Sequence, residues 1–112
     1  AQRVAQRAAF MSKKVHLDVR GVIENMSWFT GDDGKRYELF GSGGGHELAD
    51  RLGVPLLAQV PLVSDLRAGG DSGHPIAVQT DTEAGAVFAD LAERVDVELA
   101  PTRVRRAELK II

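Results

Sequence analysis

The chain has 112 residues, enough for one domain with a single core, and its 44% hydrophobic and 27% charged residues exclude a disordered, collagenous or fibrous protein. A net charge of −2 provides no basic field for nucleic acid, and without cysteine the chain has no disulfide and no thiolate ligand for zinc or an iron–sulfur cluster. No apolar run reaches the roughly 18 residues of a membrane span, and the N-terminus lacks a signal-peptide pattern, so we expect a cytoplasmic protein that does not enter the membrane.

An amphipathic helix is predicted at the start of the chain. Its apolar residues recur at helical spacing among basic and amide side chains: Val4, Ala8, Met11 and Val15. The chain begins inside this pattern, without an initiator Met or an N-cap residue, so we expect a fragment of a longer protein. The apolar run 19–23 follows and ends at Glu24-Asn25, which is typical of a parallel strand in a covered sheet.

A β-hairpin is predicted between residues 28 and 40. Two aromatic segments flank the turn cluster Gly31-Asp32-Asp33-Gly34, whose carboxylates we interpret as solvated turn residues rather than an acid/base pair. Core packing is favoured over a dimer contact for the aromatic side chains of the hairpin, which are Trp28, Phe29, Tyr37 and Phe40.

A glycine loop over residues 41–45 leads into a short helix over residues 46–52, which Gly53 is placed to end. Glycines before a helix let backbone N–H groups approach a phosphate. However, the Gly-Lys-Ser/Thr sequence of a phosphate loop is missing, and the loop follows a hairpin rather than a buried strand. A structural glycine loop is therefore favoured over a phosphate site.

The alternation of helix and strand repeats in the second half of the chain. Residues 56–60 form a second apolar run, and Ser64 is placed to cap one helical turn that reaches Ala68. The composition of residues 69–75 predicts a loop, and residues 75–78 predict a brief extended segment.

A long helix is the last predicted element, with Thr80 and Glu83 as its capping box. Its apolar residues recur at helical spacing: Ala84, Val87, Phe88, Leu91, Ala92 and Val95. No structure is readable in the basic tail, so we divide the chain into a domain over residues 1–100 and a tail over residues 101–112. The order of elements predicts an α/β fold with a mostly parallel sheet.

Two segments follow the two predicted parallel strands, at the edge where open α/β sheets bind ligands. Asn25 follows the first strand, and Pro61-Leu62 follows the second. The Asn25 amide offers a donor and an acceptor to the edge of a base, or it ties its own loop to backbone groups. The residues alone leave both interpretations open.

Neither a metal site nor a catalytic group is predicted. The three histidines have no companion at ligand spacing: His16, His46 and His74. No Ser-His-Asp order with a nucleophile context occurs either.

Six segments taken together carry a family resemblance. They are Gly21–Phe29, which reads Gly-Val-Ile-Glu-Asn-Met-Ser-Trp-Phe, and then Glu38–Gly45, Leu48–Leu57, Val60–Leu62, Arg67–Asp71 and Gly73–Pro75. In this order they resemble the C-terminal half of the Mrp/ApbC-type P-loop ATPases, iron–sulfur cluster carriers related to MinD and to the nitrogenase iron protein. The match extends over roughly residues 1 to 95 and is more specific than any single motif.

The resemblance implies a cytosolic ATPase that dimerises around two nucleotides, with a doubly wound, mostly parallel sheet of the P-loop NTPase type and the hairpin as an insertion. The residues it places against the adenine are Asn25, Pro61, Leu62 and Val63. Arg67 and Asp71, in the loop that follows, are expected to line the base or the ribose. The implied ligands and partners are ATP, with Mg²⁺ in the longer protein, a second copy, and iron–sulfur client proteins.

The sequence departs from this family pattern in two ways. The Walker A loop, the switch Asp and the Asp-x-Pro-Pro-Gly stretch are expected upstream of Ala1, so we expect no ATP hydrolysis by this chain alone. At the hairpin, where many members carry Cys-x-x-Cys, the sequence reads Thr30-Gly31-Asp32-Asp33-Gly34. Carboxylates are poor substitutes for the soft thiolates that a cluster needs, so cluster bridging in the usual way is not expected.

We therefore predict the adenine-binding, C-terminal part of an ATP-hydrolysing iron–sulfur cluster carrier or assembly protein of the Mrp type. One alternative is a non-catalytic protein-interaction module derived from the same fold, which binds a partner through its aromatic hairpin or its basic tail. Another is an iron–sulfur scaffold that borrows its ligands from elsewhere in the longer protein.

Overall fold

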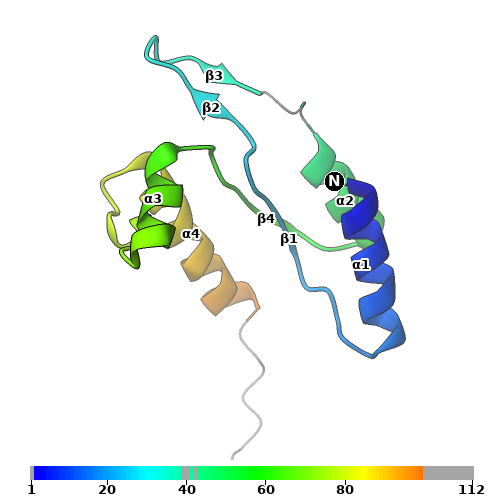
Figure 1. Ribbon diagram of the computed structural model, residues 1–112. Helices are drawn as coiled ribbons and strands as arrows, with labels where there is room; N and C mark the ends of the chain where they lie inside the picture. Colours follow the sequence, from blue (N-terminus) through cyan, green and yellow to red (C-terminus); the bar gives the residue numbers. More distant parts are fainter. Residues whose placement is uncertain (1, 39–40, 42, 100–112) are drawn as a thin grey trace, which may run out of the picture.

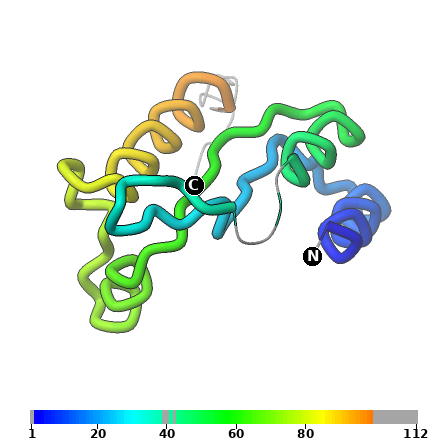
Figure 2. The backbone as a smooth tube through the Cα atoms, turned by 90° about the horizontal axis from the view of Figure 1, so that it is seen from above, coloured from blue at the N-terminus to red at the C-terminus, as the bar shows by residue number. Residues whose placement is uncertain are grey.

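A computed structural model describes residues 2–38, 41 and 43–99 of the chain. Its elements are, in chain order, α1 (Gln2–Lys14), β1 (Val22–Glu24), β2 (Phe29–Thr30), β3 (Arg36–Tyr37), α2 (Gly44–Leu52), β4 (Leu56–Gln59), α3 (Ser64–Ser72), the 3₁₀ helix η1 (Ile76–Val78) and α4 (Glu83–Glu98). Strands β1 and β4 lie at the centre, with α1 and α2 on one side and α3 and α4 on the other (Figures 1 and 2). The predicted α/β class is confirmed.

The central strands β1 and β4 are parallel, as predicted. Val22 pairs with Leu56 and Glu24 pairs with Gln59, with an irregularity in register after Val22. A parallel pair cannot be joined by a tight turn, and here the hairpin and α2 form the long connection that returns the chain to the same edge. The carboxyl ends of the two strands therefore lie next to each other.

The core lies between this strand pair and the helices on either side. Its buried apolar side chains come mainly from α2, β4, η1 and α4: Leu48, Ala49, Leu57, Val60, Ile76 and Ala84. Helix α4 is held to β4 by Arg94, whose Nη1 donates hydrogen bonds to the carbonyls of Leu56 at 2.9 Å and Leu57 at 2.7 Å. A half-buried guanidinium thus satisfies two strand carbonyls that apolar packing alone would leave without a partner.

Helix α3 is longer than the sequence predicts. The turn predicted for Ser64–Ala68 continues as helix through most of the segment 69–75, so the predicted loop is wrong there. Gly69 provides the physical reason, because a Cβ at this position would lie 2.6 Å from the carbonyl oxygen of His74. The glycine allows the chain to fold back closely against the helix rather than ending it, and Gly73, with φ 78°, is the residue at which the helix ends.

Three local predictions are wrong in detail. Ser64 is the first residue of α3 rather than its cap, and in the segment 75–78 only Pro75 is extended, because Ile76–Val78 form the 3₁₀ helix η1. The cap of α4 is Thr82 rather than Thr80, because Thr82 Oγ1 accepts the backbone N–H of Gly85 at 3.0 Å. Two threonines two residues apart offer the same capping chemistry, and only the geometry of the first turn distinguishes them.

Helix α1 forms where the sequence predicts an amphipathic helix, but it exposes its apolar stripe. None of its thirteen residues is buried, and Val4 and Met11 are 68% and 57% exposed. The side that is partly covered carries the small residues Ala5 and Ala9 instead. No helix in the described part of the chain is long and apolar enough to cross a membrane.

The predicted hairpin is confirmed. Phe29 pairs with Tyr37 in an antiparallel two-stranded sheet, and Gly34 adopts φ 78° in the turn. Core packing is correct for Trp28, which is 8% exposed, but wrong for Phe29 and Tyr37, which are both exposed. The fourth aromatic residue, Phe40, lies outside the described residues.

Two glycines in helices, one closely packed and one not, allow a matched test of how tightly the chain packs against α4. A Cβ at Gly85 would overlap the carbonyl of Gln79, whereas a Cβ at Gly70 meets nothing within 4 Å. We expect Gly85→Ala to lower the free energy of unfolding by about 2 kcal/mol through overpacking. Gly70→Ala should raise it by about 0.5–1 kcal/mol, since alanine favours a helix. Urea denaturation measures both, and equal effects would contradict the close approach at Gly85.

The hairpin turn contains one coupled pair of ionisable groups. The Tyr37 hydroxyl donates to Asp33 Oδ2 at 2.6 Å, and the Lys35 backbone N–H donates to Asp33 Oδ1 at 3.0 Å. The hydrogen bond from Tyr37, followed by that from Lys35, lowers the pKa of Asp33, and the Asp33 carboxylate raises the pKa of Tyr37.

The sign of each shift defines a pH window for the turn. The Asp33 contribution is present above its ordinary pKa and is lost as the pH falls through the lowered pKa. The Tyr37 contribution is present below its ordinary pKa and is lost as the pH rises through the raised pKa. We expect Tyr37→Phe to move the pKa of Asp33 back toward its ordinary value in an NMR titration. Phe29→Leu is the control, and an unchanged Asp33 pKa in Tyr37→Phe would show that the hydrogen bond does not form.

Candidate functional site at the ends of the parallel strands

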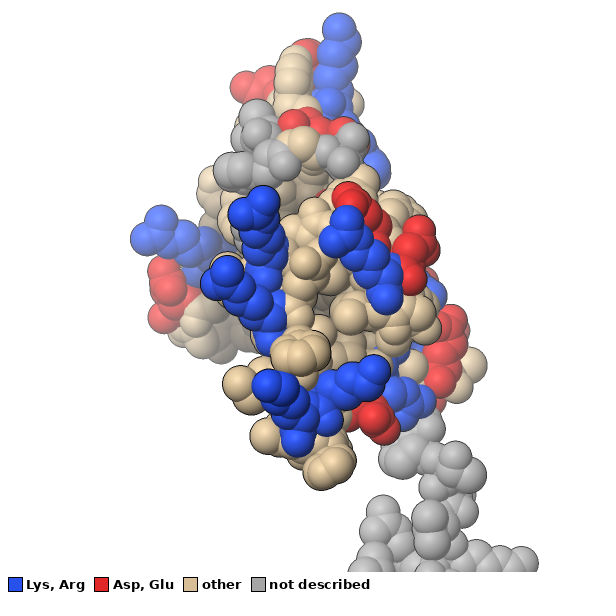
Figure 3. All heavy atoms as spheres, turned by 90° about the vertical axis from the view of Figure 1, so that its right-hand side faces the viewer, with Lys and Arg blue, Asp and Glu red and all other residues tan. Residues whose placement is uncertain are grey.

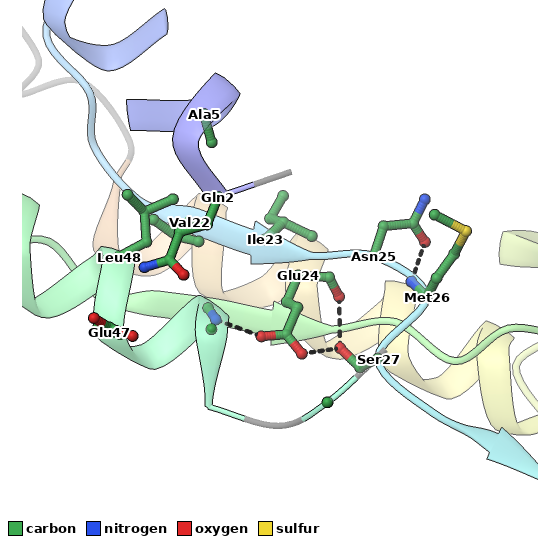
Figure 4. Close-up of a pocket in the computed structure, with 13 residues that line it drawn as sticks. Gln2, Ala5, Val22, Ile23, Glu24, Asn25, Met26, Ser27, Glu47 and Leu48 are labelled. Carbon is green, nitrogen blue, oxygen red and sulfur yellow. Dashed lines mark hydrogen bonds between the residues drawn. The ribbon is translucent and has the colours of Figure 1, made fainter. Parts of the chain in front are cut away.

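A cavity of about 640 Å³ lies beside β1, between α1 and α2 (Figure 4). It extends from the strand to the turn that follows it. The side chains that define its walls are Gln2, Val22, Asn25, Met26, Glu47 and Leu48. The cavity therefore lies along the carboxyl end of a parallel strand, which is the place where α/β sheets bind ligands.

The Glu24 carboxylate is the best-connected polar group of this cavity. Its Oε2 accepts the backbone N–H of Gly45 at 2.6 Å, and its Oε1 lies 2.8 Å from the hydroxyl of Ser27 (Figure 4). The same hydroxyl lies 2.9 Å from the Glu24 carbonyl, so its single proton is shared between two acceptors. Ser27 is 7% exposed, and both of its acceptors belong to Glu24.

Helix α2 begins at the glycine loop without a side-chain cap from its own segment. Its N-cap residue is Gly43, with φ 82°, and the Glu24 carboxylate takes the position at the helix N-terminus where an anion is favoured. A Cβ at Gly45 would overlap that carboxylate. These contacts favour the structural interpretation of the glycine loop over a phosphate site, because the protein's own carboxylate fills the anion position.

Sequence reasoning did not identify Glu24 as a site residue. The available signal was a helix that starts at two glycines without a Ser, Thr, Asp or Asn cap, together with a carboxylate at the end of a preceding strand. Nothing in the spacing of residues 24 and 45 shows that they meet, because their contact depends on how the hairpin folds back.

Asn25, the first predicted base-binding residue, is exposed at the cavity. Its Oδ1 accepts the backbone N–H of Met26 at 2.9 Å, and Met26 adopts a left-handed conformation with φ 54°. Its amide nitrogen points away from the strand (Figure 4). The side-chain oxygen of Asn25 therefore stabilises its own loop, and the side-chain N–H groups point outward. The structure shows the loop contact of this residue, and the contact with a base remains a prediction.

Backbone hydrogen bonds hold the two strand ends side by side. The Val60 N–H donates to the Glu24 carbonyl at 2.8 Å, the Ser27 N–H donates to the Val60 carbonyl at 2.9 Å, and the Leu62 N–H donates to the Trp28 carbonyl at 2.7 Å. The ladder thus continues beyond the strands proper. It places the segment after Asn25 next to the segment after Val60, as the sequence predicts.

The other predicted base-binding residues lie outside the cavity beside β1. Pro61 is fully buried, while Leu62 and Val63 are partly exposed. Arg67 lies on α3 with its side chain 88% exposed and pairs with Asp71 at 3.7 Å. The structure therefore joins Leu62 to the end of β1 through the backbone, and it does not bring Arg67 into the cavity. The assignment of all these residues to a base remains a prediction.

The residues of this chain do not fit an iron–sulfur cluster. The chain has no cysteine, and within the described ranges no group of three or more His, Asp or Glu side chains could hold a metal ion. At the hairpin turn, Asp33 is already bonded to Tyr37 and to the backbone of Lys35. No cluster chemistry follows from these side chains.

Positive charge gathers on the face formed by α1 and α2, as the space-filling view shows (Figure 3). Helix α1 carries no acidic residue, and its cations are Arg3, Arg7, Lys13 and Lys14. The chain as a whole has a net charge of −2, so this helix is a local exception. The cavity beside this helix is itself lined by two carboxylates, those of Glu24 and Glu47.

Comparisons with known proteins identify relatives of this chain. A family model described as ParA, NUBPL iron-transfer P-loop NTPase, matches residues 1–96. An iron–sulfur cluster carrier protein of Synechocystis is 45% identical over 84 residues, which is 73% of this chain and 24% of the relative. Proteins of the same description from Mycobacterium leprae and Pyrococcus furiosus are 40% and 38% identical, and the matches span 83% and 80% of this chain but only 26% and 30% of the relatives.

A solved structure supports the same relationship. It is described as a nucleotide-binding protein from Archaeoglobus fulgidus in complex with ADP, and it matches with a TM-score of 0.59 and 29% identity. The match covers 79% of this chain and 35% of that protein. The chain thus spans about a quarter to a third of the length of the relatives it matches.

The Glu24 contacts predict a stability effect. We expect Glu24→Ala to lower the free energy of unfolding by about 2 kcal/mol, because it leaves the Gly45 N–H without its acceptor and removes one of the two acceptors of the Ser27 hydroxyl. The control is Glu47→Ala, which removes an exposed pair with Arg51 and should cost less than about 0.5 kcal/mol. Urea denaturation measures both variants. A loss at Glu24 no larger than at Glu47 would show that the carboxylate does not hold α2.

Proposed function

This chain belongs to the ParA family of NUBPL-type iron-transfer P-loop NTPases, and from that membership we propose that it is the base-binding, C-terminal part of a nucleotide-dependent iron–sulfur cluster carrier. In this proposal ATP hydrolysis, with Mg²⁺, belongs to the longer cytoplasmic protein, which acts as a homodimer. The cluster is cargo for client proteins. Residues 1–100 form the part of the NTPase domain present here, and residues 101–112 form its tail.

The observation that carries this proposal is the junction of the two strand ends. Three backbone hydrogen bonds align the segments after β1 and β4, so Asn25 and Leu62 project from adjoining loops. The outward amide of Asn25 offers a donor to a ring nitrogen of a base, and the partly exposed Leu62 and Val63 offer apolar surface to its face. Pro61, which is fully buried, shapes this edge without contacting a ligand.

The contacts at the glycine loop and at Arg67 support a role for this chain in binding the base and ribose of the nucleotide. The helix N-terminus at the glycine loop is occupied by the Glu24 carboxylate, so this chain provides no free anion position there. Its contribution to nucleotide binding is therefore directed at the base and ribose rather than at the phosphates. Arg67, which is exposed and lies 3.7 Å from Asp71, is a cation that can contact the ribose or an α-phosphate.

Base recognition of this kind predicts weak but selective binding. An adenine of about ten non-hydrogen atoms, at roughly 0.3–0.4 kcal/mol each, gives a dissociation constant in the millimolar range. We expect adenosine and ATP to bind the ¹⁵N-labelled 112-residue chain within about threefold of each other. Both should shift the side-chain amide of Asn25 and the backbone amides of Leu62 and Val63 in NMR spectra, and guanosine should bind more weakly.

Asn25→Asp provides the controlled variant for this titration. Aspartate retains the acceptor for the Met26 N–H but loses the outward donor, so the loop is kept while adenosine affinity should fall about tenfold. Arg67→Ala should affect ATP more than adenosine, and Arg51→Ala, an exposed arginine in a similar helical ion pair, should affect neither. Equal binding of adenosine and guanosine, or shifts that avoid Leu62 and Val63, would contradict the assignment.

A protein-interaction module is the second candidate, and the exposed aromatic pair of the hairpin favours it. Phe29 and Tyr37 face each other across the strand pair and are each 43% exposed. Exposed aromatic side chains of this kind are enriched at protein interfaces. A chain that shows no nucleotide-induced shifts but loses partner binding in Phe29→Ser would support this second function over the first.

A further inference from the structure

The hairpin forms a sheet of its own, separate from β1 and β4 (Figure 1). Each of its strands has only two residues. A two-stranded hairpin is marginally stable in water by itself, and one this short has few cross-strand contacts to define its position. Its position relative to the rest of the protein must therefore depend on contacts from outside the strand pair.

Glu83 makes long-range side-chain hydrogen bonds to the hairpin. Its Oε1 accepts the indole N–H of Trp28 at 2.8 Å, and its two oxygens lie 3.2 and 3.3 Å from the hydroxyl of Thr30. These residues are 55 and 53 positions away in sequence. Glu83 is the first residue of α4, where the helix dipole favours a negative charge, and hydrogen bonds to a carboxylate are stronger than those between neutral groups.

Trp28 is the point at which these contacts meet. The Arg36 guanidinium lies 4.1 Å above its ring, its carbonyl accepts the Leu62 N–H at 2.7 Å, and the side chain is 8% exposed. The indole of Trp28 is thus bonded at its edge to Glu83 and covered on one face by Arg36. The backbone carbonyl of Trp28 is bonded to Leu62, in the segment that follows β4. Of these, only Glu83 joins the hairpin to α4.

The Glu83 contact is also one that can open. Among the ion pairs of the described ranges none includes Glu83, so neutral donors alone hold its carboxylate. Glu83 and Thr30 lie at the surface, and water can replace either partner when they separate. Opening therefore leaves no buried unpaired charge behind.

We infer that Glu83 is a latch for the hairpin. With its carboxylate bonded to Trp28 and Thr30, the hairpin lies against the N-terminus of α4. Without these bonds, the hairpin moves away as a unit while β1, β4 and the helices stay folded. The latch is a property of the hairpin and α4, and it does not depend on nucleotide binding.

Trp28 is the only tryptophan of the chain, so a single signal reports the state of the latch. Its indole N–H gives one peak in a ¹H–¹⁵N spectrum, and hydrogen exchange at that peak measures opening. We expect Glu83→Ala to accelerate indole exchange at least about tenfold and to shift the tryptophan fluorescence to longer wavelength. Glu83→Gln, which keeps a neutral acceptor, and Thr30→Val should each give a smaller acceleration of about three- to tenfold.

The matched control is Glu93→Gln on the exposed side of the same helix. The latch is supported if indole exchange rises in the Glu83 and Thr30 variants while the backbone amides of β1 and β4 exchange as in the unaltered protein. It is wrong if the indole rate in Glu83→Ala stays within twofold of the Glu93→Gln control. If Glu83→Ala unfolds the chain, Glu83→Gln and Thr30→Val decide. Parallel acceleration of the indole and the β1–β4 amides in them would show a global stability effect and overturn the latch.

Discussion

The Glu24 carboxylate joins three parts of the structure at one point. It belongs to β1, it bonds to the Ser27 hydroxyl in the turn after that strand, and it accepts the Gly45 N–H at the start of α2. Because the helix begins on a carboxylate rather than on a cap of its own, the direction of α2 depends on the position of β1. This attachment sets the position of α2 and therefore of the cavity wall that α2 forms, whereas backbone hydrogen bonds align the two strand ends.

The order of elements and the edge that carries the site could be predicted from the sequence, because they depend on local periodicity and on the rule that parallel strands end at the same edge. The approach of Glu24 to Gly45 and of Glu83 to Trp28 could not, since each joins residues at least 21 positions apart. The failure at α3 has a related cause. Glycine is typical of loops, yet Gly69 lies within α3 and allows the backbone of His74, beyond the end of the helix, to approach closely.

The two attachments, at Glu24 and at Glu83, differ in how deeply the bonded groups are buried. Glu24 holds the N-terminus of α2 and is itself bonded to the buried hydroxyl of Ser27, whereas Glu83 holds the hairpin through groups near the surface. Trp28 lies between them, since its carbonyl bonds to Leu62 at the proposed base-binding edge and its indole bonds to Glu83. The hairpin is therefore attached both to the segment after β4 and to the start of α4.

Helix α1 presents two opposing kinds of surface to a second copy of this chain, positive charge and exposed apolar side chains. Its four cations repel the same cations of a second copy, while the outward apolar residues Val4 and Met11 offer it apolar surface. The repulsion acts over a Debye length of about 10 Å at 0.1 M salt and about 3 Å at 1 M, but the attraction between apolar surfaces does not weaken with salt. Added salt therefore shifts the balance at α1 from charge repulsion toward apolar contact.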